Sequence, residues 1–243
     1  MVWGAMQARQ PALKADHDNS PVAEKKRFGI VRPASEEYVL DAVENLRAGN
    51  VIAVPTDTIY GFACNVRASE AIRHIYEIKG RVNTKPLAIC VGDVSEIKRF
   101  VVTNYLPHGL LDSLFPGPVT VVLKREEASE SEKFLNPGAD SLGVRIPDSN
   151  FIREIARGLG TAIALTSANL SGRPSSICIE EFEDLWVRCK NVYDGGILSS
   201  GRAGSTVIDL TLPGAYKILR PGSAKDETVR ILQNFALLEA DGT

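Results

Sequence analysis

The sequence lacks the glycine-rich signatures of the most common nucleotide-binding enzymes. It contains neither a Gly-x-x-x-x-Gly-Lys-Ser/Thr loop nor a Gly-x-Gly-x-x-Gly fingerprint. The first absence excludes a P-loop ATPase, and the second disfavours a nicotinamide enzyme. Ser167 has no Gly-x-Ser-x-Gly context and no histidine near it in the sequence, so a nucleophilic serine is not expected.

Cysteine and histidine are scarce and scattered. The four cysteines include no Cys-x-x-Cys pair, and the three histidines lie far apart in the chain. This spacing predicts neither a structural zinc site nor a disulfide framework. It favours reduced thiols, which are typical of a cytoplasmic protein.

Long apolar runs and a strong charge bias are also missing. The run Val119 to Leu123 is typical of the longest apolar stretches, far short of the length that crosses a bilayer, so no membrane partner is expected. A formal net charge of −2 argues against a protein that coats nucleic acid by bulk electrostatics. Any contact with RNA would have to come from a local basic patch.

Length and composition predict one compact domain. With 243 residues, of which 44% are hydrophobic, the chain can bury a full core over residues 29–240. Residues 1–28 are polar and mixed in charge, and we interpret them as a flexible tail. A remnant of an organellar presequence, and with it a mitochondrial or other organellar pool, is the alternative. The acidic residues Asp16, Asp18 and Glu24 count against it.

Apolar patterning predicts an α/β fold. Val51 to Val54 is a continuous apolar run, which is typical of a strand buried on both faces. Leu142, Val144 and Ile146 alternate with Gly143 and Arg145, the period of a strand that directs Arg145 away from the core. Further strands are expected over 87–91, 119–124, 161–165, 206–210 and 216–219, and helices from 35, 69, 94, 106, 148 and 226. Strands and helices interleave, and prolines flank several strands, so we predict a mixed parallel and antiparallel sheet.

Five cations lie at the predicted ends of strands or helices, beside glycine or proline. They are Lys79, Arg81, Lys85, Arg145 and Arg220. Each alone reads as a solvated surface charge. Open α/β sheets, however, bind ligands where loops gather at the strand ends. Arginine forks and lysine point charges suit phosphate oxygens, so the set predicts a triphosphate site.

Hydroxyl and amide side chains follow the same strand ends. They include Thr58, Ser141, Ser167, Asn169, Ser175 and Ser205. Such residues also form turns for local backbone reasons, so turn formation is the alternative role. Taken with the cations, they favour a site for a nucleotide and a small polar partner.

Seven motifs in order resemble the YrdC-like family. They are Pro55-Thr56-Asp57-Thr58-Ile59-Tyr60-Gly61, Lys79-Gly80-Arg81, Lys85-Pro86-Leu87, Pro116-Gly117-Pro118-Val119-Thr120, Ser167-Ala168-Asn169, Gly204-Ser205-Thr206 and Arg220-Pro221-Gly222. The resemblance runs from about Val31 to about Phe235. It implies a YrdC/RibB-like fold, in which a twisted mixed sheet flanked by helices carries a deep positively charged cavity.

The resemblance also implies an activity. Members of the family are threonylcarbamoyl-adenylate synthases, which convert L-threonine, bicarbonate or CO2, and ATP to threonylcarbamoyl-AMP and pyrophosphate. The product feeds threonylcarbamoyladenosine modification of tRNA through a downstream transferase complex. Mg²⁺ is expected to accompany ATP, held mainly by phosphates and water rather than by a protein metal site.

Carried over by motif, the family's ligand contacts fall on two sets of residues. Threonine would be held by Thr58, Arg145 and Ser205, with the backbone near Leu165. ATP would be surrounded by Lys79, Arg81, Lys85, Ser141, Ser167, Asn169, Ser175 and Arg220, and Lys79 and Arg81 would be the catalytic cations. Cys90 stands where several members have a histidine, and the chain ends one helix after Arg220-Pro221-Gly222, which matches the short single-domain form.

Two alternatives stay open at this point. A noncatalytic module could use the same positive cavity to bind tRNA or double-stranded RNA, with Tyr60 as the one aromatic residue near the basic positions that could stack on bases. A carbamoyl-transfer module of hydrogenase maturation proteins shares this domain. It requires accessory domains for which this chain has no room.

Overall fold

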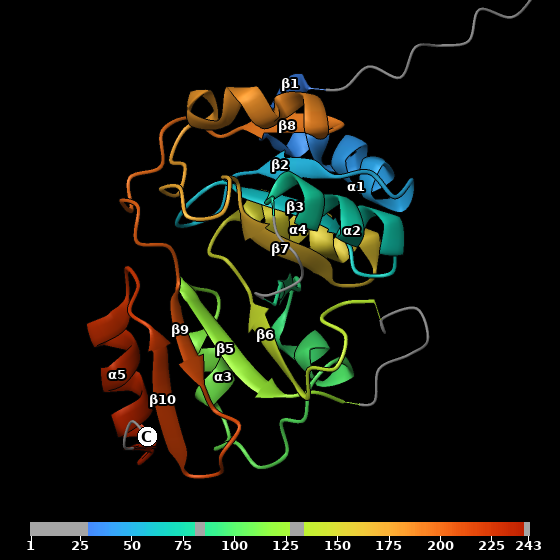
Figure 1. The fold of residues 1–243 in the computed structure, drawn as a ribbon. Coiled ribbons are helices and arrows are strands. Elements are labelled where there is room, and N and C mark those ends of the chain that lie inside the picture. The colour runs from blue at the N-terminus through green and yellow to red at the C-terminus, as the bar shows by residue number, and fades with distance from the viewer. Residues whose placement is uncertain (1–28, 81–85, 127–133, 241–243) are drawn as a thin grey trace, which may run out of the picture.

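The computed structural model describes residues 29–80, 86–126 and 134–240 (Figure 1). Within them, eleven strands form one hydrogen-bonded sheet in the order β1-β8-β2-β3-β7-β4-β6-β5-β9-β10-β11. The strands are β1 (Ile30–Pro33), β2 (Ile52–Val54), β3 (Gly61–Asn65), β4 (Ala88–Cys90), β5 (Val119–Lys124), β6 (Ser141–Arg145), β7 (Ile163–Ser167), β8 (Asn191–Asp194), β9 (Thr206–Asp209), β10 (Ala215–Arg220) and β11 (Leu238–Glu239). Both parallel and antiparallel pairs occur, which confirms the predicted mixed sheet.

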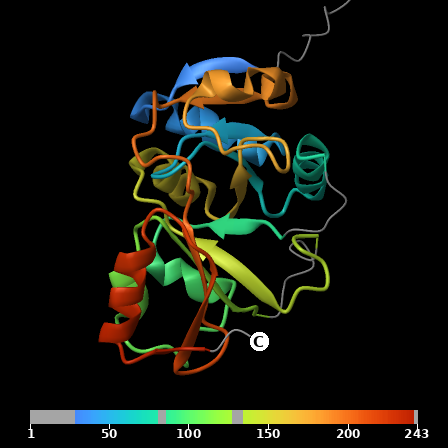
Figure 2. The ribbon, with the colours of Figure 1, turned by 60° about the vertical axis from the view of Figure 1, so that its left-hand side comes forward.

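Helices lie along the sheet. The α-helices are α1 (Val39–Arg47), α2 (Ser69–Ile78), α3 (Leu110–Leu114), α4 (Asn150–Leu159) and α5 (Lys225–Asn234), and the 3-10 helices include η1 (Glu36–Tyr38), η2 (Val94–Arg99) and η4 (Ile179–Arg188). In Figures 1 and 2 the strands β1, β8, β2, β3 and β7 lie above, with α1, α2 and α4, and the strands β5, β9 and β10 lie below, with α3 and α5. Strands β4 and β6 join the two parts of the sheet.

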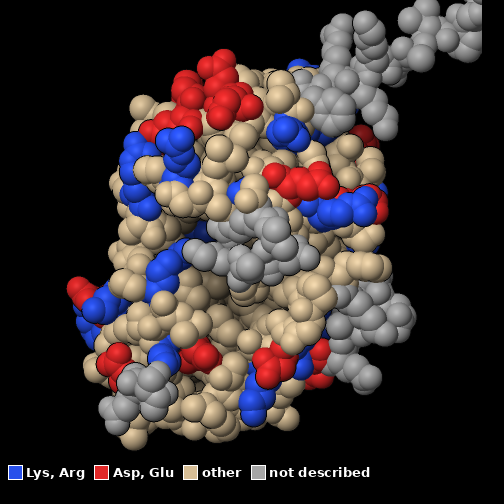
Figure 3. All heavy atoms as spheres, viewed as in Figure 1, with Lys and Arg blue, Asp and Glu red and all other residues tan. Residues whose placement is uncertain are grey.

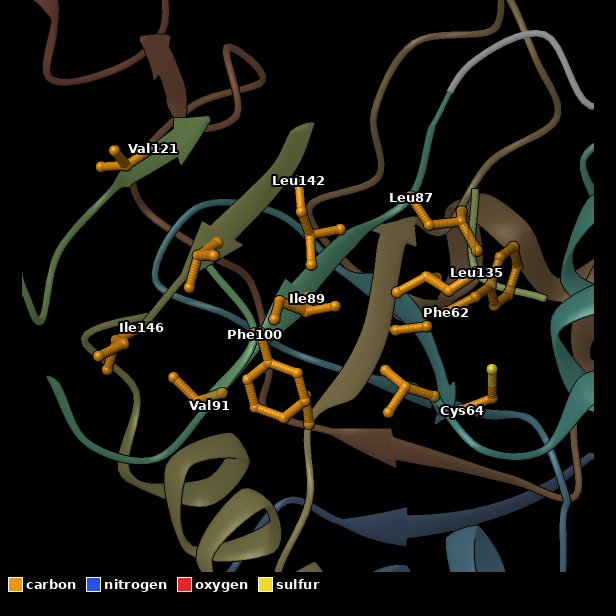
Figure 4. Close-up of a cluster of buried hydrophobic side chains, with 14 of the residues drawn as sticks. Phe62, Cys64, Leu87, Ile89, Val91, Phe100, Val121, Leu135, Leu142 and Ile146 are labelled. Atoms are coloured by element: carbon orange, nitrogen blue, oxygen red, sulfur yellow. The ribbon is translucent and has the colours of Figure 1, made fainter. Parts of the chain in front are cut away.

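Two apolar clusters cover opposite faces of the sheet. One includes Cys90, Ile163 and Leu165 with residues of α1 and α4. The other contains Phe62 and Ile89 with residues of α2, α3 and α5, and Figure 4 shows Ile89 amid side chains from β3 and β6. Full burial of one such aliphatic or aromatic side chain stabilises the fold by about 1.5–3 kcal/mol. Packing on both faces of the sheet therefore holds the strand ends in fixed positions.

Several element boundaries differ from the sequence-based expectations. The helix expected from 94 is the short 3-10 helix η2, and the helix expected from 106 begins only at Leu110, as the five residues of α3. The helix expected from 148 begins at Asn150. Gly61–Asn65, which was not among the expected strands, also forms a strand, β3. This strand escaped prediction because Gly61 and Asn65 break its apolar pattern. The division into a tail and a single domain stays a prediction.

Candidate functional site

One row of residues crosses the sheet on a single face. Cys90 pairs with Arg145, and Thr120 pairs with Val207, which in turn pairs with Arg220. Val144 opposite Val121 sets Arg145 beside Thr120, because partners in register share a face. The neighbouring row of paired residues across these strands points to the opposite face and contains only aliphatic side chains. The strand alternation predicted around Arg145 is therefore confirmed, although Arg145 is buried, with a relative exposure of 6%.

Arg145 is held by the turn that follows β2. Its Nη2 donates to Thr58 Oγ1 at 2.6 Å and to Thr56 Oγ1 at 3.3 Å, and it also pairs with the carboxylate of Asp57. The Thr56 hydroxyl in turn accepts from the backbone N–H groups of Thr58 and Ile59. The sequence Thr56-Asp57-Thr58 thus folds into a self-bonded turn that fixes one nitrogen of the guanidinium.

Lys79 forms a second cluster at the end of β7. It caps α2 at its C-terminus, and its Nζ donates to Ser167 O at 2.6 Å, Ser167 Oγ at 3.1 Å and Asn169 Oδ1 at 2.7 Å. The Ser167 hydroxyl donates to the same Asn169 oxygen at 2.6 Å. Lys79 is 2% exposed, so its ammonium is an organising centre for the Ser167–Asn169 turn.

Arg220 forms a third cluster with Ser205. Its Nη2 donates to Ser205 O at 2.8 Å and to Ser205 Oγ at 3.3 Å, and Ser205 Oγ lies 2.8 Å from Thr120 Oγ1. Burial, and next the positive charge of Arg145, lower the pKa of Arg220. The two guanidinium groups are therefore near enough to repel one another.

Backbone and hydroxyl contacts join the clusters. Ala168 N donates to Tyr60 O at 2.8 Å, which couples the Ser167–Asn169 turn to the turn that holds Arg145. Ser200 Oγ donates to Thr58 O at 2.5 Å. Tyr60 itself is fully buried, and its hydroxyl donates to Gly196 O at 2.8 Å, so Tyr60 cannot stack on a base.

Glycines allow backbone segments to meet beside these clusters. A Cβ on Gly222 would lie 2.3 Å from the carbonyl carbon of Ser205, so only glycine fits where the chain after β10 crosses the chain before β9. A Cβ on Gly143 would lie 3.2 Å from Thr120 Cγ2. These glycines keep Ser205 and Thr120 in place.

The remaining predicted site residues lie less centrally. Leu165 faces Ala63 and Ala88 in the neighbouring strands, and Ser141 begins β6, four residues before Arg145. Ser175 lies in the loop after β7, where its carbonyl accepts a bond from Arg202. Arg81 and Lys85 lie outside the described residues. Seven of the predicted site residues thus lie in the three clusters: Thr58, Lys79, Arg145, Ser167, Asn169, Ser205 and Arg220. Ser141 and Ser175 lie outside these clusters.

Cys90 lies next to Arg145 but is closed to solvent. It has no exposed surface, and burial raises the pKa of its thiol to about 12. A neutral buried thiol is a small apolar side chain. The position that carries a histidine in several YrdC-like proteins is therefore part of the packed core here.

The sequence-based search missed Asp57 and Thr120, although both lie inside the quoted motifs. Asp57 is acidic, so it was not expected in a site that binds anions. Thr120 lies inside an apolar strand, where a single threonine has no distinctive pattern. The register of β5 against β6 and β9 is what brings Thr120 beside Arg145 and Ser205. Such neighbours become visible only once strand order is known.

Positive charge on the visible face is dispersed. Figure 3 shows lysine and arginine side chains in separate groups, with acidic groups between them, rather than as one continuous basic surface. Among the described residues, no group of histidine, cysteine, aspartate and glutamate side chains could hold a metal ion. No described helix is long and apolar enough to span a membrane.

Known proteins resemble this chain over most of its length. A Sua5/YciO/YrdC family model, described as "Telomere recombination", matches residues 44–222. The threonylcarbamoyl-AMP synthase of Bos taurus is 48% identical over 212 residues, 85% of this chain and 76% of the relative. That of Homo sapiens is 49% identical over 216 residues, 84% of this chain and 76% of the relative.

A solved structure agrees with the sequence relatives. P. abyssi Sua5, complexed with L-threonine, is 28% identical and matches with a TM-score of 0.74 over 86% of this chain. This chain spans 61% of the length of that protein. Motifs, fold and relatives thus agree, and the chain belongs to the Sua5/YciO/YrdC family.

Proposed function

We propose that this chain is an L-threonylcarbamoyladenylate synthase, a nucleotidyltransferase. It forms threonylcarbamoyl-AMP and pyrophosphate from L-threonine, bicarbonate or CO2, and ATP. The product supplies threonylcarbamoyladenosine modification of tRNA. Relatives that are nearly half identical over 84–85% of this chain carry the name of this activity.

The observation that carries the proposal is a pair of neighbouring arginines, of which Arg145 is buried and Arg220 is exposed at the end of β10. Arg145 is 6% exposed, and its charge, after the larger effect of partial desolvation, lowers the pKa of Arg220 on the same row of the sheet. Like charges held close together, one of them in the protein interior, are unfavourable unless an anion joins them. A carboxylate, a carbamate and a triphosphate are the anions that the reaction provides.

The three clusters divide between the two substrates. Thr58, Arg145 and Ser205, with Leu165 beside them, bind threonine. The ATP site comprises Lys79, Arg81, Lys85, Ser141, Ser167, Asn169, Ser175 and Arg220, of which Lys79 and Arg81 are the catalytic cations. The contact of Arg220 with Ser205 supports this division, because adenylation requires the threonine and ATP sites to adjoin.

The chemistry needs little proton transfer from the protein. The threonine amine adds to CO2 and releases a proton to the solvent, or condenses with bicarbonate with loss of water, and becomes a carbamate. A carbamate oxygen attacks the α-phosphorus of ATP, the bond to the β-phosphate oxygen breaks, and pyrophosphate leaves. The protein holds two anions together and stabilises charge on the departing phosphates, by positioning and by electrostatics.

Lys79 acts mainly by organising the phosphate side. Its Nζ donates to Ser167 O, Ser167 Oγ and Asn169 Oδ1, each within 3.1 Å. The ammonium thereby fixes a hydroxyl and an amide and adds a buried positive charge behind them. A phosphate oxygen that displaced one of these acceptors would complete the site.

Mg²⁺ enters with ATP as part of the substrate. Asp57 contacts the clustered residues, but its negative charge is paired with Arg145 and its side chain is only 8% exposed. Phosphates and water therefore supply the ligands of the ion. We also infer a reducing cytoplasmic or organellar setting. The macromolecular partners that we expect are tRNA and the downstream transferase complex.

Pyrophosphate release tests the function. Purified protein is incubated with MgATP, threonine and bicarbonate, and each substrate is omitted in turn. We expect release that requires all three. Release that continues without threonine would defeat the substrate assignment.

A further inference from the structure

We infer that Asp57 is a positioning residue, which orients Arg145 toward the carboxylate of threonine. The inference rests on the proposed function. It concerns an acidic side chain in a site built for anions, where a carboxylate is otherwise unfavourable.

Asp57 connects two loops of the site. Its Oδ1 accepts from Arg145 Nη2, and its Oδ2 accepts from the backbone N–H of Asp148 at 2.9 Å. Its side chain is 8% exposed. The carboxylate thus fastens the turn after β2 to the turn after β6, and Arg145 lies between them.

The attachment leaves part of the guanidinium unused. The three side-chain oxygens that bind Arg145, from Thr56, Asp57 and Thr58, all contact Nη2. The Nε of Arg145 is buried and has no hydrogen-bond partner among the described residues. A buried donor without a partner is costly, so a ligand oxygen at this position would be strongly favoured.

Asp57 also lowers the net positive charge around Arg145 and Arg220. Arg145 and Arg220 together carry two positive charges, and Asp57 offsets one of them through its ion pair. The one positive charge that remains matches the negative charge of one substrate carboxylate. Without the Asp57 charge, the two arginines would repel more strongly, and Arg145 would lose the contact that fixes its direction.

Other roles of Asp57 do not fit its contacts. A metal ligand or general base needs an oxygen directed at its target, but Arg145 and Asp148 N each bond to one oxygen, which leaves one lone pair on each in a side chain that is only 8% exposed. The carboxylate therefore acts through Arg145 rather than on the substrate.

Threonine binding to Asp57→Asn tests this role. Titration calorimetry of the whole chain with threonine, without ATP, gives a reading even for inactive variants. We expect affinity to fall by at least about 10-fold, because a charge-assisted contact is lost, with ATP affinity changed by less than about 3-fold. Asp93→Asn is the matched control: Asp93 also pairs with an arginine, Arg157, and we expect threonine affinity there to stay within about 2-fold of wild type.

A double-mutant cycle separates positioning from a merely structural role. Arg145→Lys keeps the charge but loses the planar fork. In that background, Asp57→Asn is expected to change threonine affinity by less than about 2-fold. An equal loss in both backgrounds would overturn the inference. If Asp57→Asn does not fold, Asp57→Glu, which displaces the carboxylate by one methylene, replaces it under the same criterion.

The outcomes also separate this inference from the proposed function. Failure of the wild-type protein to bind threonine overturns the function itself. Wild-type binding together with unaltered binding by Asp57→Asn overturns only the positioning role.

Discussion

Replacing Lys79 by methionine removes the ammonium that organises the Ser167–Asn169 turn while keeping the length of the side chain. Three oxygens lose their shared donor. Asn169 Oδ1 still accepts from the Ser167 hydroxyl at 2.6 Å. The backbone carbonyl of Ser167 loses the 2.6 Å bond from Nζ and keeps only the bond from Asn169 N at 3.0 Å.

The expected loss of stability follows from that one acceptor. A hydrogen bond lost from a charged donor costs about 1.5–3 kcal/mol. For a domain of this size, each kcal/mol lowers the melting temperature by roughly 2–4 °C, so we expect a decrease of about 3–12 °C. The loss of turnover is expected to be larger, about 100-fold or more in kcat/KM for ATP, because electrostatic groups act most strongly where charge develops.

Two measurements on Lys79→Met are needed, and one control. Thermal unfolding gives stability, and pyrophosphate release at varied ATP gives kcat/KM. Lys98→Met removes an exposed lysine of η2 and is expected to change neither. If Lys79→Met melts and turns over like the wild type, the role that we derive for its hydrogen bonds is wrong.

Three further outcomes are expected. Gly222→Ala would force a Cβ to 2.3 Å from the Ser205 carbonyl carbon, so we expect a loss of about 1–3 kcal/mol in denaturant unfolding and impaired threonine binding; wild-type values would contradict the crossing geometry. Native protein treated with maleimide should be labelled at the half-buried Cys178 and not at the three buried cysteines, as peptide mass spectrometry would reveal. The Arg157 hydrogen bond lowers the pKa of Asp93, so its stabilisation is present above about pH 4 and is lost as the pH falls through that lowered pKa. Asp93→Asn should therefore cost up to about 1 kcal/mol at pH 7 and progressively less as the pH falls below about 4, and a penalty independent of pH would refute this.

Much of the site was predictable because its residues follow strand ends. Lys79, Ser167 and Asn169 lie beside glycine, proline or a strand terminus, and the structure joins them by direct hydrogen bonds. The alternation around Arg145 also gave the correct face of β6. Local patterns of this kind carry their own signal.

What escaped prediction depends on long-range pairing. Strand β8 at Asn191–Asp194 enters the sheet between β1 and β2, a placement that no local pattern encodes. Neighbours distant in sequence also bury Cys90 and fix the position of Tyr60. The same is true of Asp57, which joins the turn after β2 to the turn after β6. Sequence spacing cannot reveal them, because packing rather than propensity determines these contacts.

Carbon-13 bicarbonate tests the central claim, that the clustered cations bring threonine-derived carbamate to ATP. The protein is incubated with MgATP, threonine and labelled bicarbonate, and the nucleotide product is analysed by mass spectrometry. We expect threonylcarbamoyl-AMP that contains one labelled carbon, released with pyrophosphate. An adenylate without the label, such as threonyl-AMP, would contradict the account.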